Sequence, residues 1–280
     1  MHNTKISEVK GFAILCMLLG HVIQILSDNY LDNKLFVIIY SFHMPILMFI
    51  SGYFFRFSVE KYSLQELVKN KCKHILIPII FWSFPIFLFR FFSLFSSGHS
   101  FSESLCTVGM SFFGLWFLWS VFLNSIWVGI IKKVFANNLI IHIVSIMACF
   151  FIPICAPYLF MFICFEIGYG LARIQLKRII DNNLIFICSL LFCIILLYFY
   201  KSSYLCDISG MSVLRGGIKQ LAVDLYRLVS ALLVSFFIIS FFLRIKVIKI
   251  LDLYGIHTMG IYILSMYLLS MGGGRYLGLY

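Results

Sequence analysis

The stretch LFVIIYSFHMPILMFISGYFF, residues 35–55, decides which kind of fold this chain can adopt. Its 21 residues include no Asp, Glu, Lys or Arg. A helix needs about 20 apolar residues to cross the hydrocarbon core of a bilayer, so this stretch is long enough to span a membrane. It also contains His43, and an ionisable side chain inside such a span indicates a functional site.

Apolar runs of similar length occur along the rest of the chain. Working outward from residues 35–55 gives eight further candidate spans. The nine candidates are 11–27, 35–55, 75–95, 108–131, 138–156, 158–172, 184–200, 225–243 and 253–271. We therefore expect an all-α, polytopic integral membrane bundle of about nine to ten transmembrane helices, built as a single membrane-embedded domain over residues 1–280.

The composition excludes most other classes of protein. Hydrophobic residues make up 62% of the 280 residues and charged residues only 12%, with a mean hydropathy of +1.02. An average soluble domain has about 25% charged residues. This chain is therefore no cytosolic enzyme, nucleic-acid-binding module or disordered segment, and we expect membrane lipid rather than nucleic acid as its partner.

The distribution of positive charge predicts an orientation. With the N-terminus inside and the spans alternating, the inner segments contain 15 Lys and Arg and the outer segments contain 5. Lys and Arg gather on the cytoplasmic side of membrane proteins. We expect a multi-pass protein of the bacterial cytoplasmic (inner) membrane with a cytoplasmic N-terminus, and nine spans then place the C-terminus outside.

Four side chains that can take part in chemistry fall near one depth of this bundle. They are His21, His43, Trp116 and Glu166. At 1.5 Å per residue, His21 lies about 16 Å past Lys10, and the other three each lie about 12 Å inside their spans. The hydrocarbon core is about 30 Å thick, so all four fall near its middle. We expect them to gather at one intramembrane site, with Glu166 facing the two histidines.

Each of these side chains also has an ordinary structural interpretation. A buried histidine or Glu166 can simply hydrogen-bond a neighbouring helix, and Trp116 can be a packing residue. Arg90 lies about 22 Å from the inner boundary and can extend its side chain to the outer interface. In the functional interpretation, Arg90 and Trp116 bind substrate. Both interpretations stay open at the level of sequence.

The absence of several known motifs narrows the range of reactions that this chain can catalyse. GxSxG, HExxH, GxGxxG and P-loop patterns do not occur, and no cluster of His, Cys and carboxylates has the spacing of metal ligands. We therefore expect no metal. A buried neutral imidazole can take a proton from a hydroxyl and return it to a leaving group. The histidines are thus the residues best suited to catalysis.

Two longer motifs resemble a known family. Lys10 and His21 match the first helix of the membrane acyltransferase 3 family, in which a basic residue and a His are separated by ten residues, and Ser41–Phe55 resembles the second helix almost letter for letter. Further matches in family order are Ile77–Trp82, Leu115–Leu118, Phe165–Tyr169 and Gly260–Leu264. The subgroup with this pattern is similar to bacterial O-acetyltransferases of surface polysaccharides and their lipid-linked precursors.

The resemblance implies an integral membrane O-acyltransferase, an enzyme that transfers groups other than amino-acyl groups. It would move an acetyl group from cytoplasmic acetyl-CoA to a sugar hydroxyl of a surface polysaccharide such as an O-antigen, or of its lipid-linked precursor. His21 would be the central catalytic residue, as a base or a transient acyl carrier, with His43 lining the same cavity. Lys10 would attract the CoA phosphates. The basic segment 56–74, which includes Lys71, Lys73 and His74, would recruit CoA, although plain positive-inside topology also explains its charge.

The sequence departs from the family pattern in four places. Ser7 stands where the family commonly has an acid, His74 where it has the second basic residue of a pair, and Ser265 where it often has His. The chain also stops at Tyr280, where many members continue into one more helix. Two alternatives therefore stay open: a transporter or flippase of a lipid-linked sugar, and an inactive truncated member. The acyl group, the acceptor position and the oligomeric state also stay open.

Overall fold

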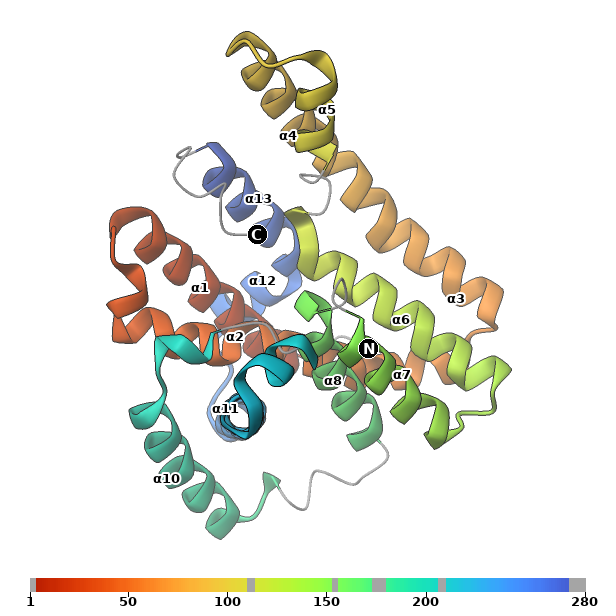
Figure 1. Ribbon diagram of the computed structural model, residues 1–280. Helices are drawn as coiled ribbons and strands as arrows, with labels where there is room; N and C mark the ends of the chain where they lie inside the picture. The colour runs from red at the N-terminus through yellow and green to blue at the C-terminus, as the bar shows by residue number, and fades with distance from the viewer. Residues whose placement is uncertain (1–3, 110–113, 153–155, 173–179, 206–209, 272–280) are drawn as a thin grey trace.

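The computed structural model describes residues 4–109, 114–152, 156–172, 180–205 and 210–271 (Figure 1). Every regular element within these ranges is helical. Large apolar side chains point outward from α4 (Ile77–Ser96), α7 (Leu139–Phe151) and α10 (Asn183–Phe199), as helices in contact with lipid require. The chain is a polytopic membrane helix bundle, and the predicted fold class is confirmed.

The first two helices form an antiparallel hairpin at the centre of the bundle. They are α1 (Thr4–Leu26) and α2 (Lys34–Lys61), joined by a short loop with a 3₁₀ turn at Tyr30–Asp32. Asn33 caps α2 because its side-chain oxygen accepts the backbone N–H groups of Leu35 and Phe36 at 2.9 and 3.2 Å. Most of α2 is buried, and α2 runs through Pro45 as one helix.

The next segment lies along one edge of the bundle. In α3 (Leu64–Lys71) a capping box joins Ser63 and Glu66, and a π-helical turn at Cys72–Leu76 leads directly into α4. Together they form one long rod, and α5 (Phe101–Gly109) folds back beside the far end of α4, which projects from the rest of the bundle (Figure 1). The π turn widens the helix immediately after Lys71, which changes the direction of the side chains that follow.

The remaining helices pack around the central hairpin. They are α6 (Trp116–Val134), α7, α8 (Ala156–Leu171), α10, α11 (Gly210–Arg244), α12 (Lys249–Ile256) and α13 (Thr258–Met271). Helix α12 packs on α1, and α8 and α11 pack on α2. Gly52 and Gly168 allow α2 and α8 to touch through their backbones, because a Cβ on either would collide with the carbonyl oxygen of Phe165 or Phe49.

Each of the nine predicted spans overlaps an apolar helix in the described residues. Five of these helices are long enough to cross a membrane, and four shorter ones have 10–17 residues. Two boundaries differ from the prediction. In the span predicted at 108–131, residues 108–109 end α5 and α6 begins at Trp116, after Leu115 with its non-helical backbone angles; residues 110–113 lie outside the described residues. The span predicted at 253–271 is divided at His257, where α12 ends and α13 begins.

Candidate active site

His21 and His43 come together where α1 packs on α2. Gly20 brings the helices close, since a Cβ on it would lie 2.7 Å from the Tyr40 ring and 3.5 Å from Ile39 Cγ2. The Tyr40 ring then meets the His43 ring edge to face, with centroids 4.7 Å apart. Both histidines are buried, and they are close enough to interact electrostatically. The helix packing thus brings the two predicted histidines to one site.

The hydrogen bonds of the two rings define what they can do chemically. His43 Nδ1 lies 2.8 Å from the carbonyl oxygen of Ile39. A carbonyl only accepts, so Nδ1 bears the proton and Nε2 of the neutral ring holds a lone pair. His21 Nδ1 is buried without a hydrogen-bond partner among the described residues. The site therefore holds two imidazoles with uncommitted ring nitrogens, which suits proton transfer to and from a hydroxyl.

Two lysines lie near each other at the opposite end of the α1–α2 contact. Lys10 Nζ lies 5.7 Å from the centroid of the Phe54 ring, and Lys71 Nζ lies 5.1 Å from that of Phe55. The two ammonium groups interact electrostatically and repel each other. An anion bound between them would relieve this repulsion. Lys10 and His21 are 11 residues apart on α1, so the cationic end and the histidine pair are about 16 Å apart along the helix axis.

Lys73 and His74 do not join Lys10 and Lys71. Both belong to the π-helical turn after Lys71, and both are exposed, whereas Lys71 is partly buried. Of the four residues predicted to bind the acyl donor, the structure therefore brings two together. The donor-binding roles of Lys73 and His74 stay predictions.

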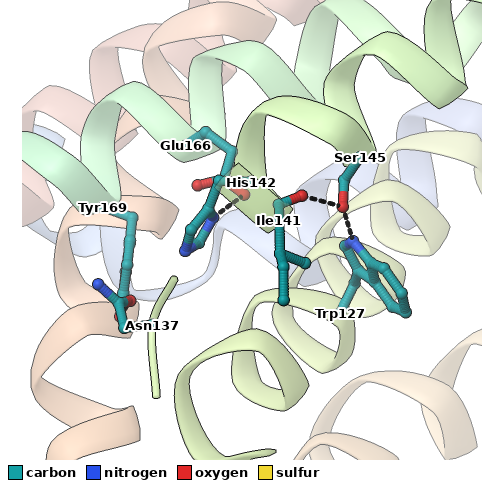
Figure 2. A network of polar contacts seen from close by, with 7 residues as sticks. All are labelled: Trp127, Asn137, Ile141, His142, Ser145, Glu166 and Tyr169. Atoms are coloured by element: carbon teal, nitrogen blue, oxygen red, sulfur yellow. Dashed lines mark hydrogen bonds and ion pairs between the residues drawn. The ribbon is translucent and has the colours of Figure 1, made fainter. Parts of the chain in front are cut away.

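Glu166 lies at a different place from the one expected. Its Oε1 is 2.8 Å from Nδ1 of His142, a histidine of α7 (Figure 2). Its neighbours Phe165 and Gly168 on α8 pack against residues 49–52 of α2. These residues of α2 lie six to nine positions beyond His43, which is about 9–14 Å from His43 along the helix axis. Helix α8 uses Phe165 and Gly168 against α2, which turns Glu166 toward α7. The catalytic role of Glu166 stays a prediction, without a described contact to His21 or His43.

The two residues predicted to bind substrate lie elsewhere in the bundle. Arg90 is half-buried on α4, the helix that contacts α5 and α13. Trp116 is the first residue of α6, and its ring contacts Phe117, which in turn packs on Tyr262 of α13. Neither is among the described contacts of the histidine pair. Their roles in substrate binding stay predictions.

Two buried polar residues were missed by the sequence reasoning. His142 stands alone in the apolar run 138–156 and is buried. A lone ionisable residue inside a predicted span was the feature of the sequence that could have indicated it. Glu8 is fully buried, accepts the backbone N–H of Ile248 at the start of α12, and lies 3.1 Å from Lys5 Nζ. Glu8 stands next to Ser7, where the family commonly has an acid, and this was the feature of the sequence that could have indicated it. Among the described residues, no group of three or more His, Cys, Asp or Glu side chains has the arrangement of a metal site.

Comparisons with known proteins agree with the resemblance of the motifs. A family model described as an acyltransferase domain matches residues 5–279. A nodulation protein NolL of Mesorhizobium japonicum is 29% identical over 141 residues, which are 49% of this chain and 37% of that protein. The nodulation protein NolL of Sinorhizobium fredii is 34% identical over 123 residues, 40% of this chain and 32% of that protein. The matches span about a third of the length of these relatives. No solved structure matches this chain significantly.

Proposed function

The chain belongs to the membrane acyltransferase 3 family, and we propose that it transfers an acetyl group from acetyl-CoA to a sugar hydroxyl of a bacterial surface polysaccharide or its lipid-linked precursor. The single observation that carries this proposal is the arrangement along α1. Two buried imidazoles with nitrogens that have no partner among the described residues lie about 16 Å from a pair of lysines close enough to repel each other. A donor with an anionic end and a long thioester arm fits this arrangement.

The histidine pair performs the proton transfers of the proposed reaction. The acceptor hydroxyl oxygen attacks the thioester carbonyl carbon, and its proton passes to an imidazole nitrogen. As the carbon–sulfur bond breaks, the same proton passes from the imidazole to the leaving sulfur, so that an ester and a free thiol result. His43 is oriented for this step because Ile39 fixes its Nδ1 proton and leaves Nε2 as the acceptor.

His21 is the residue that the family motif places at the centre of the reaction. Its unpartnered Nδ1 allows either of two roles. In one it is the base for the hydroxyl, and in the other it takes the acetyl group as a transient carrier before passing it on. Both routes use the same net reaction and require the same two imidazoles. Burst kinetics with acetyl-CoA alone distinguish them, because only the carrier route releases CoA before the acceptor is added.

The proposal includes a position in the cell. The protein lies in the cytoplasmic membrane with its N-terminus inside, supported by the 15 basic residues of the inner segments against 5 outside. Lys10 and Lys71 then lie on the cytoplasmic side, where acetyl-CoA is available. The histidine pair lies deeper in the bundle, within reach of an acceptor that enters from the opposite side.

The decisive experiment compares the surface glycan of the wild-type strain with that of a deletion strain by NMR. We expect O-acetyl signals that are present in the wild type, absent from the deletion strain and restored by the intact gene. Membranes from the complemented strain should also transfer labelled acetyl groups from acetyl-CoA to the isolated glycan. Unchanged O-acetylation in the deletion strain, with no transfer in membranes, contradicts the proposal.

A further inference from the structure

The side chain of Tyr40 lies in the contact between α1 and α2, beside His43. A Cβ on Gly20 of α1 would lie 2.7 Å from Cε2 of the Tyr40 ring, so the ring fits there only because residue 20 has no side chain. The Tyr40 hydroxyl donates a long hydrogen bond to Gln24 Oε1, also of α1, at 3.3 Å. Tyr40 and His43 are three residues apart on α2, so their side chains share one face of the helix. Tyr40 thus joins the helix that holds His21 to the ring of His43.

The ring of Tyr40 is also held from within α2. The ring of Phe36, which lies about one turn before Tyr40, stacks on it with centroids 4.0 Å apart and 29° between the ring planes. Phe36 is buried, and the ring of Tyr30 contacts it in turn with centroids 5.0 Å apart. A ring that is stacked on one neighbour, packed on a second helix and hydrogen-bonded at its far end has little room to move.

His43 needs a second contact to fix the direction of its ring. Its Nδ1–H donates to the carbonyl oxygen of Ile39 at 2.8 Å. One hydrogen bond fixes the position of Nδ1, but the ring can still rock about that atom, and Nε2 then moves most because it lies on the far side of the ring. The Tyr40 ring meets the imidazole edge to face, with centroids 4.7 Å apart and 63° between the planes, which is a preferred arrangement of aromatic pairs. The hydrogen bond and the ring contact together determine where Nε2 points.

We infer that Tyr40 is a positioning residue for His43, and that residue 20 is a glycine because it leaves space for the Tyr40 ring. The inference rests on the proposed function, in which His43 Nε2 accepts a proton from the acceptor hydroxyl. Proton transfer requires the two heavy atoms to lie within hydrogen-bonding distance, so a tilted imidazole slows this step. Tyr40 acts through His43 and not on the donor. Its loss should therefore lower kcat and leave the KM for acetyl-CoA close to that of the wild type.

The first test compares two substitutions of Tyr40 in membranes that contain equal amounts of the full chain. Tyr40→Leu removes the ring contact and should lower kcat about tenfold, which corresponds to about 1.4 kcal/mol of barrier. Tyr40→Phe keeps the ring and loses only the hydrogen bond to Gln24, so it should retain at least about half of the wild-type kcat. Initial rates over a range of acetyl-CoA concentrations give both constants. Wild-type kcat in Tyr40→Leu, or equal losses in the two variants, overturns the inference.

The second test separates positioning from a general structural role by using His43→Ala as the background. No imidazole remains to be positioned there, so adding Tyr40→Leu should change kcat by less than about twofold. A further tenfold loss in the double variant means that Tyr40 supports the fold and not His43, and it overturns the inference.

Gly20→Ala tests the same ring from the side of α1. The added methyl group displaces the Tyr40 ring and should lower kcat about threefold, but it should have no further effect in Tyr40→Leu, where the smaller side chain leaves room. Additive losses in this pair contradict the role assigned to Gly20.

Tyr53→Leu is the matched control. Tyr53 is a partly buried tyrosine of the same helix, and its ring contacts Phe54 and Phe57 and has no described contact with His43. This variant should keep the wild-type kcat, and a loss as large as that of Tyr40→Leu overturns the inference. A wild type that transfers no acetyl group from acetyl-CoA contradicts the proposed function itself. Wild-type transfer with additive losses in Tyr40→Leu and His43→Ala contradicts only the role of Tyr40.

Discussion

The His21–His43 pair of the α1–α2 hairpin and the His142–Glu166 pair of α7 and α8 both join two helices through buried imidazoles. Their partners differ. His43 Nδ1–H donates a hydrogen bond to a neutral backbone carbonyl, and His21 Nδ1 has no partner in the described residues. His142 Nδ1 faces a carboxylate at 2.8 Å. A neutral partner leaves an imidazole free to accept a proton, whereas a carboxylate at hydrogen-bonding distance fixes the orientation of the ring.

The comparison separates two uses of buried histidine in one bundle. The hairpin pair is suited to moving protons during a reaction. The α7–α8 pair is suited to holding an orientation, because Figure 2 shows the His142 ring joined to the Glu166 carboxylate. Substitutions in the hairpin pair should therefore lower kcat more than substitutions in the α7–α8 pair.

The largest effect is expected at His21. His21→Ala should lower the rate of acetyl transfer by about 10²–10⁴-fold, the usual cost of losing a general base, while the protein stays in the membrane. Glycan NMR and the amount of protein in the membrane fraction check both parts. Wild-type O-acetylation at an equal protein level would falsify the mechanism proposed for the histidine pair.

His43 and His142 provide the most direct test of the comparison. His43→Ala removes the oriented Nε2 acceptor and should lower kcat by about a hundredfold. His142→Ala should lower kcat at saturating acetyl-CoA by less than about tenfold, because its ring joins α7 to Glu166 of α8 and has no described contact with the histidine pair. Both constants come from initial rates over a range of acetyl-CoA concentrations. Equal losses of kcat in the two variants contradict the distinction between the pairs.

A smaller effect is expected at the lysine pair. Lys10→Ala should raise the KM for acetyl-CoA by about tenfold with a modest change in kcat, since a charge that attracts the donor acts on binding. Lys10→Arg should be tolerated because it retains the charge. Lys73→Ala is the control, because Lys73 is exposed whereas Lys71 is partly buried. If Lys73→Ala raises KM as much as Lys10→Ala, then general surface charge rather than a defined site attracts the donor.

The smallest effect on the rate is expected at Glu166. Glu166→Gln keeps the size of the side chain but weakens the contact with His142, which should lower the stability of the folded protein by about 1–3 kcal/mol. The thermal unfolding of the detergent-purified protein measures this loss. kcat at saturating donor should change by less than about threefold, which corresponds to about 0.65 kcal/mol of barrier. A loss of kcat as large as that of His43→Ala would restore the catalytic role predicted from sequence.

The sequence predicts the spans well because membrane crossing depends on length and hydropathy, which are local properties. It also predicts the meeting of His21 and His43, since a tight hairpin brings both to one level. The position of Glu166 was not predictable in this way. Depth along a helix does not determine the face to which a side chain points, and the backbone contacts of Phe165 and Gly168 with α2 determine that face. The π turn that separates Lys73 from Lys71 likewise has no sequence signal as clear as an apolar run.

The contacts of Glu8 join the first helix of the bundle to one of its last. The carboxylate of Glu8 accepts the N–H of Ile248, and Lys5 donates to the carbonyl of Ile245 at 2.7 Å, in both cases across 240 residues of sequence. A ribosome makes the N-terminal helix first, so α1 waits in the membrane for nearly the whole of translation before its partner exists. During that time Lys5 is the counter-charge available to Glu8. The helix that holds Lys10 and His21 is therefore among the first to be inserted, and its contacts with the start of α12 form among the last.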